Sequence, residues 1–546
     1  MVLAHPSGAK GLRIRPALVF HIVKRKVGSG RNRRQARLDS SHLSAPIGKR
    51  NRMLTQDAID THRFAQVPAQ FNLIDGKRVA SASGETLATL SPIDGSVLAH
   101  LPQSSAVDVD RAVAAARAAF EDGRWAARAP AERKAVMLAW ADLIEAHALE
   151  IAVLGARENG TEIRMAFNAE PRNAAATIRY YAETVDKTYG EIAPTQSDVL
   201  GLIHRVPVGV IGVIVPWNFP LMIGTWKLGP ALAAGNSVVL KPSESASLSL
   251  LRICELALEA GMPPGVLNVV TGDGAGAGEA LALSNDVDVL AFTGSGRVGR
   301  RLLECAAQSN LKRVYLELGG KSANVIFPDA TLEAAVGGII GAIFPNSGQV
   351  CVAASRLLIH RDIFDEVLEQ VAKRAEGLKI GDPLSLENTT GAIHSAAQLQ
   401  TCLGFVEGAI ADGAEIVTGG GALHAESGGT YMAPTILKGA APEARVFQDE
   451  VFGPVLTAHP FEDEADALRL ANATKYGLAG AVWTNDLSRA HRMIRGLHTG
   501  MVQVNRAAPV DVTSPLGGVK QSGNGYDKSL HALDKFTNLK TAWLQI

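Results

Sequence analysis

Cysteine is scarce in this sequence, with four in 546 residues, and no two of them form a CxxC pair. Four cysteines in a chain of this size do not make the disulfide framework that stabilises small secreted proteins. The sequence also lacks an HExxH motif, and its histidines are scattered. It therefore predicts neither a disulfide-stabilised fold nor a metal site.

A long apolar run and a net charge are missing as well. The stretch "ALVFHIV" at 17–23 is far too short to cross a bilayer, and no other segment resembles a transmembrane helix. Lysine and arginine together number 54, as do aspartate and glutamate, so the whole chain predicts neither an acidic nor a basic partner. The composition, 47% apolar and 20% charged, is that of a soluble globular protein, and the length predicts two or three domains.

The zero net charge hides a basic N-terminal segment. Residues 1–52 contain 13 lysines or arginines and one acid, Asp39, against 41 basic and 53 acidic residues in the rest of the chain. Such a segment could bind nucleic acid or an anionic membrane, or act as a mitochondrial transit peptide. We favour the alternative that residues 1–53 are a disordered extension outside the folded unit, or a translated leader ahead of a true start at Met53.

A regular alternation of strands and helices begins near residue 206. Continuous β-branched runs are typical of strands buried on both faces, and helical segments such as "LSLLRICELALEAG" separate them. Repeated strand–helix–strand units predict a parallel sheet covered by helices. A second series follows Gly320, and we expect the helices of residues 54–185 to pack on the first sheet. The predicted strands of the first series are "VGVIGVIVP", "NSVVLKPS", "GVLNVVTG", "VDVLAFTG" and "KRVYLELGG".

Two glycine-rich turns lie between predicted strands and helices. "GSGRVG" at 294–299 matches GxGxxG, and "GDGAGAG" at 272–278 occupies the previous strand-to-helix turn. Glycines there let the backbone approach a pyrophosphate, and the helix N-terminus supplies free amides. A glycine turn is common in any α/β fold, but two on adjacent turns favour a nucleotide site. The absence of GxxxxGK[ST] argues against an ATPase P-loop.

Polar residues follow several predicted strands. Lys241 and Glu244 in "LKPSE" would lie at the carboxyl edge of the sheet, where α/β proteins bind ligands. An acid there can bond ribose hydroxyls, which favours NAD over NADP, although the two residues could instead form a surface ion pair. Asn218 in "VPWNFP" could donate its amide to a developing oxyanion or make a turn hydrogen bond. Glu317 in "LELGGKS" could be a general base with a raised pKa or a structural acid.

The four cysteines differ in their surroundings. Cys254, Cys305 and Cys402 stand among apolar residues at helical spacing, where cysteine acts as a small buried hydrophobic residue. Cys351 instead follows a predicted helix, in the loop "NSGQVCVAAS". An accessible loop of small residues is the setting that a reactive thiol needs, so Cys351 is the candidate nucleophile.

Together these motifs resemble the aldehyde dehydrogenase superfamily over nearly everything after about residue 60. The matching motifs, in family order and spacing, are "VPWNFP", "LKPSE", "FTGS", "ELGGKS", "GQVC", "EVFGPV" and "YGLAGAVWT". The C-terminal run "KQSGNGYDKSLHALDKFTNLKTAW" is most similar to bacterial γ-glutamyl-γ-aminobutyraldehyde dehydrogenases. The resemblance implies a cytoplasmic enzyme that uses NAD and needs neither a metal nor a membrane.

The resemblance also implies an α/β fold of three parts. A Rossmann-like cofactor domain is expected at 54–185 and 208–319, and an α/β catalytic domain at 320–520. A small β oligomerisation arm is expected at 186–207 and 521–546, which would give a homodimer or homotetramer.

The implied reaction begins when Cys351, as a thiolate, attacks the aldehyde carbon. Asn218 and the Cys351 backbone amide would hold the oxyanion, and hydride would pass to NAD. Glu317 would then activate the water that hydrolyses the thioester, since relatives that transfer the acyl group to coenzyme A lack this glutamate. Lys227 would hold Asn218 and Glu317 in place. The residues implied in cofactor binding are Trp217, Lys241, Ser243, Glu244, Gly274, Phe292, Thr293, Gly294, Ser295, Gly299, Leu318, Gly319, Glu450 and Phe452.

Departures from the family pattern concern the substrate side. Pro345 replaces a common aromatic residue, Leu516 a phenylalanine and Tyr526 an arginine, and "ENGTE" at 158–162 replaces the common "DTGKP". We expect an aminoaldehyde or a semialdehyde as substrate. Arg506 could pair with a substrate carboxylate or face solvent.

The alternatives to an NAD enzyme are an NADP-preferring semialdehyde dehydrogenase and an inert relative that binds nucleic acid through its basic segment.

Overall fold

A parallel sheet lies at the centre of the first half of the fold, in a computed structural model that describes residues 54–506 and 511–546. The predicted basic extension at 1–53 lies outside the described residues, as do residues 507–510 of the loop after Asn505. The five predicted strands pair in parallel, in the order β9-β8-β7-β10-β11. Their bounds are β7 (Val210–Ile214), β8 (Ser237–Lys241), β9 (Leu267–Val269), β10 (Val289–Gly294) and β11 (Arg313–Leu318).

Three short strands that the sequence did not predict extend this sheet at its edges. The pair β1 and β2 joins antiparallel beside β9, and β21 joins antiparallel beside β11. Each has only two or three residues, which is too short for a period-2 pattern to be recognised. Their bounds are β1 (Asn72–Ile74), β2 (Lys77–Val79) and β21 (Gly523–Asn524).

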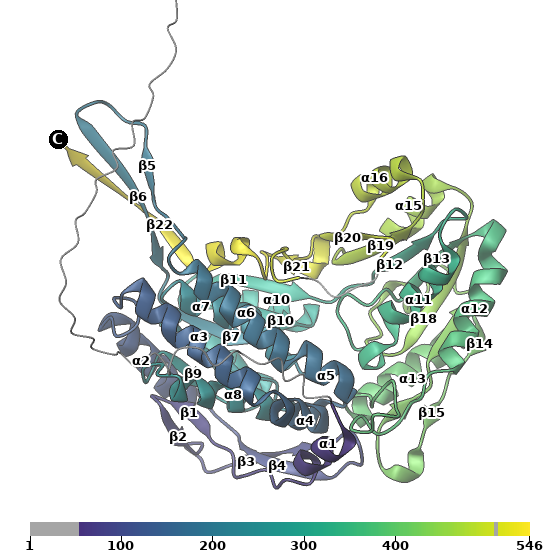
Figure 1. Ribbon diagram of the computed structural model, residues 1–546, viewed down its shortest axis with the longest axis horizontal. Helices are drawn as coiled ribbons and strands as arrows, with labels where there is room; N and C mark the ends of the chain where they lie inside the picture. The colour runs from purple at the N-terminus through teal and green to yellow at the C-terminus, as the bar shows by residue number, and fades with distance from the viewer. Residues whose placement is uncertain (1–53, 507–510) are drawn as a thin grey trace, which may run out of the picture. The chain divides into compact units, whose positions relative to one another are not determined.

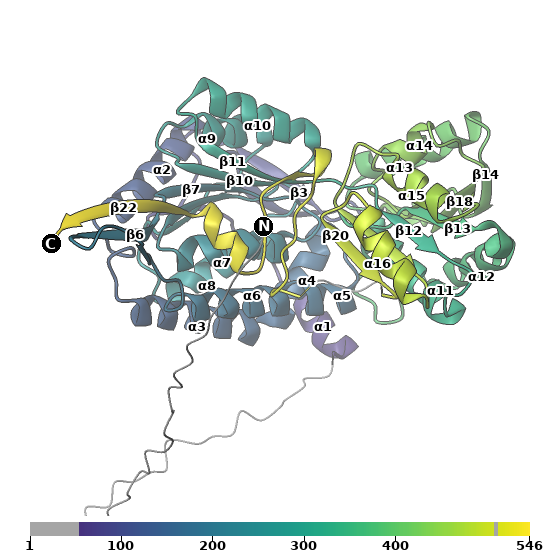
Figure 2. The same cartoon turned by 90° about the horizontal axis from the view of Figure 1, so that it is seen from above.

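Helices cover both faces of the first sheet because its central strands are apolar on both sides. In β7, Ile211 and Val213 face one core, and Val210 and Ile214 face the other. Figure 2 shows α3, α6, α7 and α8 on one face and α2, α9 and α10 on the other. The helices of this half are α1 (Gln56–Arg63), α2 (Ala106–Glu121), α3 (Pro130–Ala146), α4 (Ala148–Asn159), α5 (Ile163–Ala169), α6 (Pro171–Thr184), α7 (Pro220–Ala233), α8 (Leu248–Glu259), α9 (Glu279–Leu283) and α10 (Gly296–Gln308).

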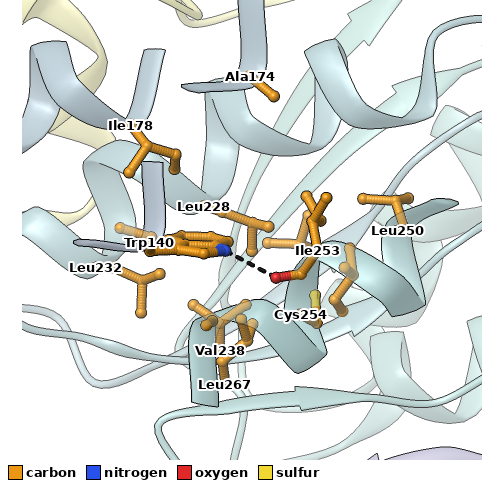
Figure 3. Packing of buried hydrophobic residues seen from close by; sticks show 14 of the residues in the cluster. Trp140, Ala174, Ile178, Leu228, Leu232, Val238, Leu250, Ile253, Cys254 and Leu267 are labelled. Atoms are coloured by element: carbon orange, nitrogen blue, oxygen red, sulfur yellow. Dashed lines mark hydrogen bonds between the residues drawn. The ribbon is translucent and has the colours of Figure 1, made fainter. Parts of the chain in front are cut away.

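A buried tryptophan packs inside the larger of these two cores. Trp140 of α3 is fully buried against Ile178 of α6 and Leu228 of α7, and its indole Nε1 donates to the Ile253 carbonyl oxygen at 2.7 Å (Figure 3). Burying the ring without that acceptor would leave an unpaired donor, so this bond makes a large apolar residue compatible with the position. Cys254 packs in the same cluster, as its helical spacing predicts.

A second sheet forms from the second series of strands. All its pairs are parallel except β14 with β17. Helices α11 and α12 pack on one face, and α15 and α16 on the other. The elements are β14 (Glu415–Thr418), β17 (Thr435–Lys438), β18 (Val455–Phe461), β13 (Arg356–His360), β12 (Ala323–Ile326), β19 (Ala479–Trp483) and β20 (Met501–Val504) in sheet order, with α11 (Leu332–Ile343), α12 (Phe364–Glu376), α13 (Ala396–Ala411), α14 (Arg445–Gln448), α15 (Glu464–Asn472) and α16 (Leu487–Gly496).

A separate antiparallel sheet joins residues 186–207 to the C-terminal segment, the two parts of the expected oligomerisation arm (Figure 1). Strand β22 (Thr537–Gln545) pairs along its whole length with β6 (Val199–Pro207), and β6 pairs with β5 (Glu191–Ala193). Two smaller pairs are β3 (Thr86–Leu90) with β4 (Val97–Pro102), and β15 (Ala422–Leu423) with β16 (Tyr431–Met432). With two largely parallel sheets covered by helices, the predicted α/β class is confirmed.

Candidate active site

Cys351 lies in a turn just after α11, on the wall of a cavity of about 650 Å³. The 3-10 turn Pro345–Gly348 precedes it. Cys351 is half-buried, whereas Cys254, Cys305 and Cys402 are buried in helices. The cavity wall is mainly apolar, and its larger apolar side chains are Met165, Phe219, Met222, Ile223, Trp226, Met501 and Leu516.

Asn218 is fixed beside the turn that leads into Cys351. Its Nδ2 donates to the Gln349 carbonyl oxygen at 3.0 Å. The Asn346 side chain donates to the same oxygen at 3.3 Å, and the Gln349 side chain donates back to the Asn346 carbonyl oxygen at 3.0 Å. One of the two N–H groups of the Asn218 amide is therefore engaged by the backbone, which fixes the direction of the other.

Glu317 lies at the carboxyl end of β11 and is only 4% exposed. Its Oε1 has no hydrogen-bond partner in the described part of the chain. Burial, with a further contribution from Asp527, raises the pKa of Glu317 to about 8, although Lys227 and Lys535 oppose that shift. A buried carboxyl with a free oxygen and a pKa near neutrality is suited to proton transfer.

The surroundings of the Cys351 thiol affect how readily it forms the thiolate that the resemblance implies. Burial raises its pKa, and the neighbouring carboxyls of Glu317 and Glu450 raise it further. Both effects disfavour a second negative charge in a desolvated site. Removal of the thiol proton by a base would therefore favour attack. Sequence reasoning missed this because desolvation depends on contacts that are distant along the chain.

Two glycines directly after β11 let the Glu450 carboxylate and the Cys351 backbone approach the end of the strand. A Cβ on Gly319 would lie 1.9 Å from Oε2 of Glu450, and a Cβ on Gly320 would lie 2.7 Å from the Cys351 carbonyl oxygen. The Gly320 N–H also donates to Glu450 Oε1 at 3.2 Å. The "LGG" of this motif therefore requires glycine so that both groups can pack against the strand end.

Lys227 has a different partner from the expected one. Its ammonium donates to Asp527 Oδ2 at 2.6 Å, rather than to Asn218 or Glu317, and Lys535 donates to the other oxygen of Asp527. A water-sized cavity is lined by Lys227, Glu317, Asp527 and Lys535. Asp527 and Lys535 were not predicted as site residues, because nothing local in "GYDKSLHALDK" indicates a partner 300 residues away.

The expected cofactor residues stand at the carboxyl edge of the first sheet. Lys241 ends β8 and is 2% exposed, and its ammonium lies 3.4 Å from the carboxylate of Glu244, whose side chain is 47% exposed. Ser295 caps α10 by accepting from Val298 N at 3.3 Å, and it is exposed. Gly274 is exposed, and a Cβ there would meet no atom within 4 Å. This set of a buried ammonium, a half-exposed carboxylate and an exposed helix N-terminus fits a dinucleotide.

Trp217 stands between two rings. It stacks on His394 with centroids 4.1 Å apart and meets Phe452 edge-on at 5.3 Å. His394 Nε2 lies 2.7 Å from Ser245 Oγ, which lies 3.1 Å from Ser243 Oγ. His394 was not predicted as a site residue, because a single histidine after "GAI" carries no motif.

Other expected cofactor residues face the core instead of the surface. Phe292 and Leu318 belong to the cluster between the sheet and α10. A Cβ on Gly299 would lie 3.0 Å from the Leu318 side chain, so this glycine serves the packing of helix on strand. Thr293 is also buried, and Gly294 ends β10.

Two classes of site are not found in the described ranges. Across residues 54–506 and 511–546, no group of three or more His, Cys, Asp or Glu side chains could hold a metal ion. No helix in the same ranges is both long and apolar enough to span a membrane.

Comparison with known proteins identifies the family. Residues 79–542 match the sequence profile of the aldehyde dehydrogenase family. The NADP/NAD-dependent aldehyde dehydrogenase PuuC of Escherichia coli (strain K12) is 49% identical over 474 residues, which cover 87% of this chain and 95% of PuuC.

Two solved structures are similar over 90% of this chain and the whole of theirs. A mutant of the P. syringae indole-3-acetaldehyde dehydrogenase AldA, in complex with NAD⁺, is 46% identical with a TM-score of 0.89. The γ-glutamyl-γ-aminobutyraldehyde dehydrogenase of Burkholderia cenocepacia J2315 is 46% identical with a TM-score of 0.88. The motif resemblance is thereby confirmed: the chain belongs to the aldehyde dehydrogenase family and is an oxidoreductase.

Proposed function

We propose that the protein oxidises an aldehyde to the free carboxylic acid, with NAD⁺ and a covalent intermediate on Cys351. The observation that supports this most directly is the grouping around the Cys351 thiol on the cavity wall: the buried Glu317 carboxyl lies near enough to affect its pKa, and the Asn218 amide is bonded to the Gln349 carbonyl oxygen, two residues before it. A nucleophile, a base and an oxyanion donor are the parts that acyl transfer through a thioester needs.

Each chemical step uses a residue of this chain. The Cys351 sulfur bonds to the aldehyde carbon while the thiol proton passes to the Glu317 carboxylate. The free N–H of Asn218 and the Cys351 backbone N–H stabilise the oxyanion that forms. Bound NAD⁺ supplies the acceptor for the hydride that leaves the adduct. Glu317 then gives up that proton to solvent, takes one from the water that attacks the thioester, and passes it to the departing Cys351 sulfur, so that the acid is released and the thiol is restored.

NAD is the proposed cofactor, with Lys241 and Glu244 at the adenosine ribose. The half-exposed Glu244 carboxylate would accept hydrogen bonds from the ribose hydroxyls, and it would repel a 2′-phosphate. An NADP-preferring enzyme is the second candidate, because the similar enzyme PuuC is named for both cofactors.

The proposed substrate is an aminoaldehyde or semialdehyde whose distal end carries no charge in the cavity. The wall is mainly apolar, and its charged members are the buried Glu162 and the exposed Arg164. A free ammonium would lose its hydration there, and the wall carboxylate of Glu162 is already bonded to Asn346 N, whereas an acylated amine could bond the amides of Asn168 and Asn173. Arg506 is exposed and is not among the lining residues, so its pairing with a substrate carboxylate has no support.

We also propose that the protein is a homodimer or homotetramer. The three-stranded sheet exposes Ile192, Leu539 and Trp543, and β5 leaves one of its edges unpaired in the described chain. Exposed apolar side chains beside an open strand edge are suited to pairing with a second copy.

An aldehyde panel tests the function. NADH formation is followed with NAD⁺ and with free or N-acylated aminoaldehydes of equal length, and the acid product is identified by mass spectrometry. We expect the acylated compound to have the higher kcat/KM. Absence of NADH with every aldehyde would contradict the proposed activity, and a preference for the free amine would contradict the substrate class alone.

A further inference from the structure

Thr161 and Glu162, which follow α4, both bind Asn346 in the turn before Cys351. The carboxylate of Glu162 lies beside Asn346, with both oxygens 3.2 Å from the Asn346 backbone N. The Thr161 hydroxyl donates to the Asn346 side-chain oxygen at 2.7 Å. Thr161, Glu162 and Asn346 are all buried, which strengthens these bonds relative to bonds at the surface.

The turn at Asn346 and Ser347 has a strained backbone. Both residues have φ 51° and ψ 35°, in the left-handed region, which is unfavourable for serine and which asparagine enters more readily than other residues with a side chain. Such conformations persist only where surrounding contacts enforce them, and they concentrate at functional sites. Thr161 and Glu162 supply two of those contacts.

The strained residue connects directly to the oxyanion donor. The Asn346 side chain donates to the Gln349 carbonyl oxygen, which also accepts the Asn218 amide. The Asn346 carbonyl oxygen in turn accepts from the Gln349 side chain and backbone N, each at 3.0 Å. Gln349 is two residues before Cys351, so a change at Asn346 would move both the Asn218 amide and the nucleophile.

We propose that Thr161 and Glu162 are positioning residues for aldehyde oxidation, which orient Asn218 and Cys351 through Asn346. This inference rests on the proposed function. A misplacement of about 1 Å in a reacting group is enough to lower a rate by about 10²-fold, so a hydrogen-bonded support of this kind is expected to affect the chemical step. Neither residue is required to touch the substrate's reacting carbon.

The competing explanation is that Glu162 is only a buried structural acid, and the chain contains a matched control for it. Glu158, at the end of α4, is also buried and accepts from Leu248 N at 2.8 Å and Ser249 N at 3.0 Å, at the start of α8. Burial raises the pKa of both Glu158 and Glu162 to about 7. The hydrogen bonds of Glu158 go to the start of α8 and not to the turn before Cys351. Glu158 is therefore as buried as Glu162 but is not placed to position Cys351.

The test compares Glu162→Ala, Glu162→Gln and Thr161→Val with Glu158→Gln. The rate constant of the first NADH burst, KM, the melting temperature and the rate of Cys351 alkylation by iodoacetamide are measured for each. We expect Glu162→Ala to lower the burst rate constant by about 10- to 100-fold with little change in KM. Glu162→Gln retains an acceptor for Asn346 N, so it should restore the rate to within about 3-fold of wild type.

The remaining variants decide the alternatives. Thr161→Val should slow the burst by about 3- to 10-fold, a smaller loss because one bond of the pair is kept, and it serves if Glu162→Ala does not fold. Glu158→Gln should lower the melting temperature without slowing the burst. A wild-type burst in both Thr161→Val and Glu162→Ala, or equal slowing in Glu158→Gln, would overturn the proposal. If wild type oxidises no aldehyde, the proposed function fails, and altered Cys351 alkylation in Glu162→Ala but not Glu158→Gln still supports the positioning role.

Discussion

The ammonium of Lys227 and the carboxylate of Asp527 form a buried ion pair, 2.6 Å apart, with side chains that are 1% and 2% exposed. The pair ties α7 of the first sheet to the C-terminal segment, and Lys535 shares the same carboxylate. Removing the acid would leave two ammoniums buried without a counter-charge, which is far more costly than the loss of a surface pair.

Asp527→Asn is therefore expected to lower the free energy of unfolding by about 3–5 kcal/mol, as measured by urea denaturation. Glu464→Gln, which breaks the exposed pair with Arg492, is the control and should cost at most about 1 kcal/mol. Equal stability losses in the two variants would show that the buried pair has no special role.

Glu317→Gln should separate the two halves of the reaction. Glutamine keeps the volume of the side chain but cannot take a proton from water, so thioester hydrolysis should slow by about 10²-fold or more. Stopped-flow absorbance should still show a burst of NADH, although a slower one because Glu317 also receives the thiol proton. Steady-state turnover that remains unchanged would remove Glu317 from the hydrolytic step.

The buried acid Glu170 makes folding stability depend on pH. Burial raises its pKa from 4.5 to about 8, so between those values the folded protein holds a proton that the unfolded chain has released. The stabilisation of the folded state by the protonated Glu170 carboxyl is fully present below pH 4.5. It is lost as the pH rises through 8, by up to about 1.4 kcal/mol per pH unit. Unfolding measured from pH 5 to 8 should show that Glu170→Gln becomes more stable relative to wild type as pH rises. A stability difference between Glu170→Gln and wild type that stays constant across this pH range would contradict the assignment.

We expect the Glu244 carboxylate to determine whether the enzyme prefers NAD or NADP. Glu244→Ser should raise kcat/KM for NADP by about 10-fold, because the charge that repels a 2′-phosphate is removed. It should lower kcat/KM for NAD, because hydrogen bonds to the ribose are lost. Initial rates with both cofactors give the ratio of kcat/KM for NADP to that for NAD. If Glu244→Ser leaves this ratio unchanged, the cofactor's ribose lies elsewhere.

The central strands could be predicted from the sequence because β7 to β11 are continuous β-branched runs with a helix between each pair. Strands β1, β2 and β21 could not, because two or three residues carry no period. The sequence indicated Cys351 and Glu317 through local context. It could not indicate the Lys227–Asp527 pair or the support of Asn346 by Glu162, which join segments 300 and 184 residues apart. The raised pKa of the Cys351 thiol likewise depends on burial and on two distant carboxyls.

The stoichiometry of the NADH burst tests the nucleophile most directly. Enzyme at known concentration is mixed with NAD⁺ and an oxidised aldehyde, and NADH is counted per chain in wild type, Cys351→Ala and Cys305→Ala. The account predicts one NADH per chain in wild type and in Cys305→Ala, and none in Cys351→Ala. Sustained NADH formation by Cys351→Ala would contradict it.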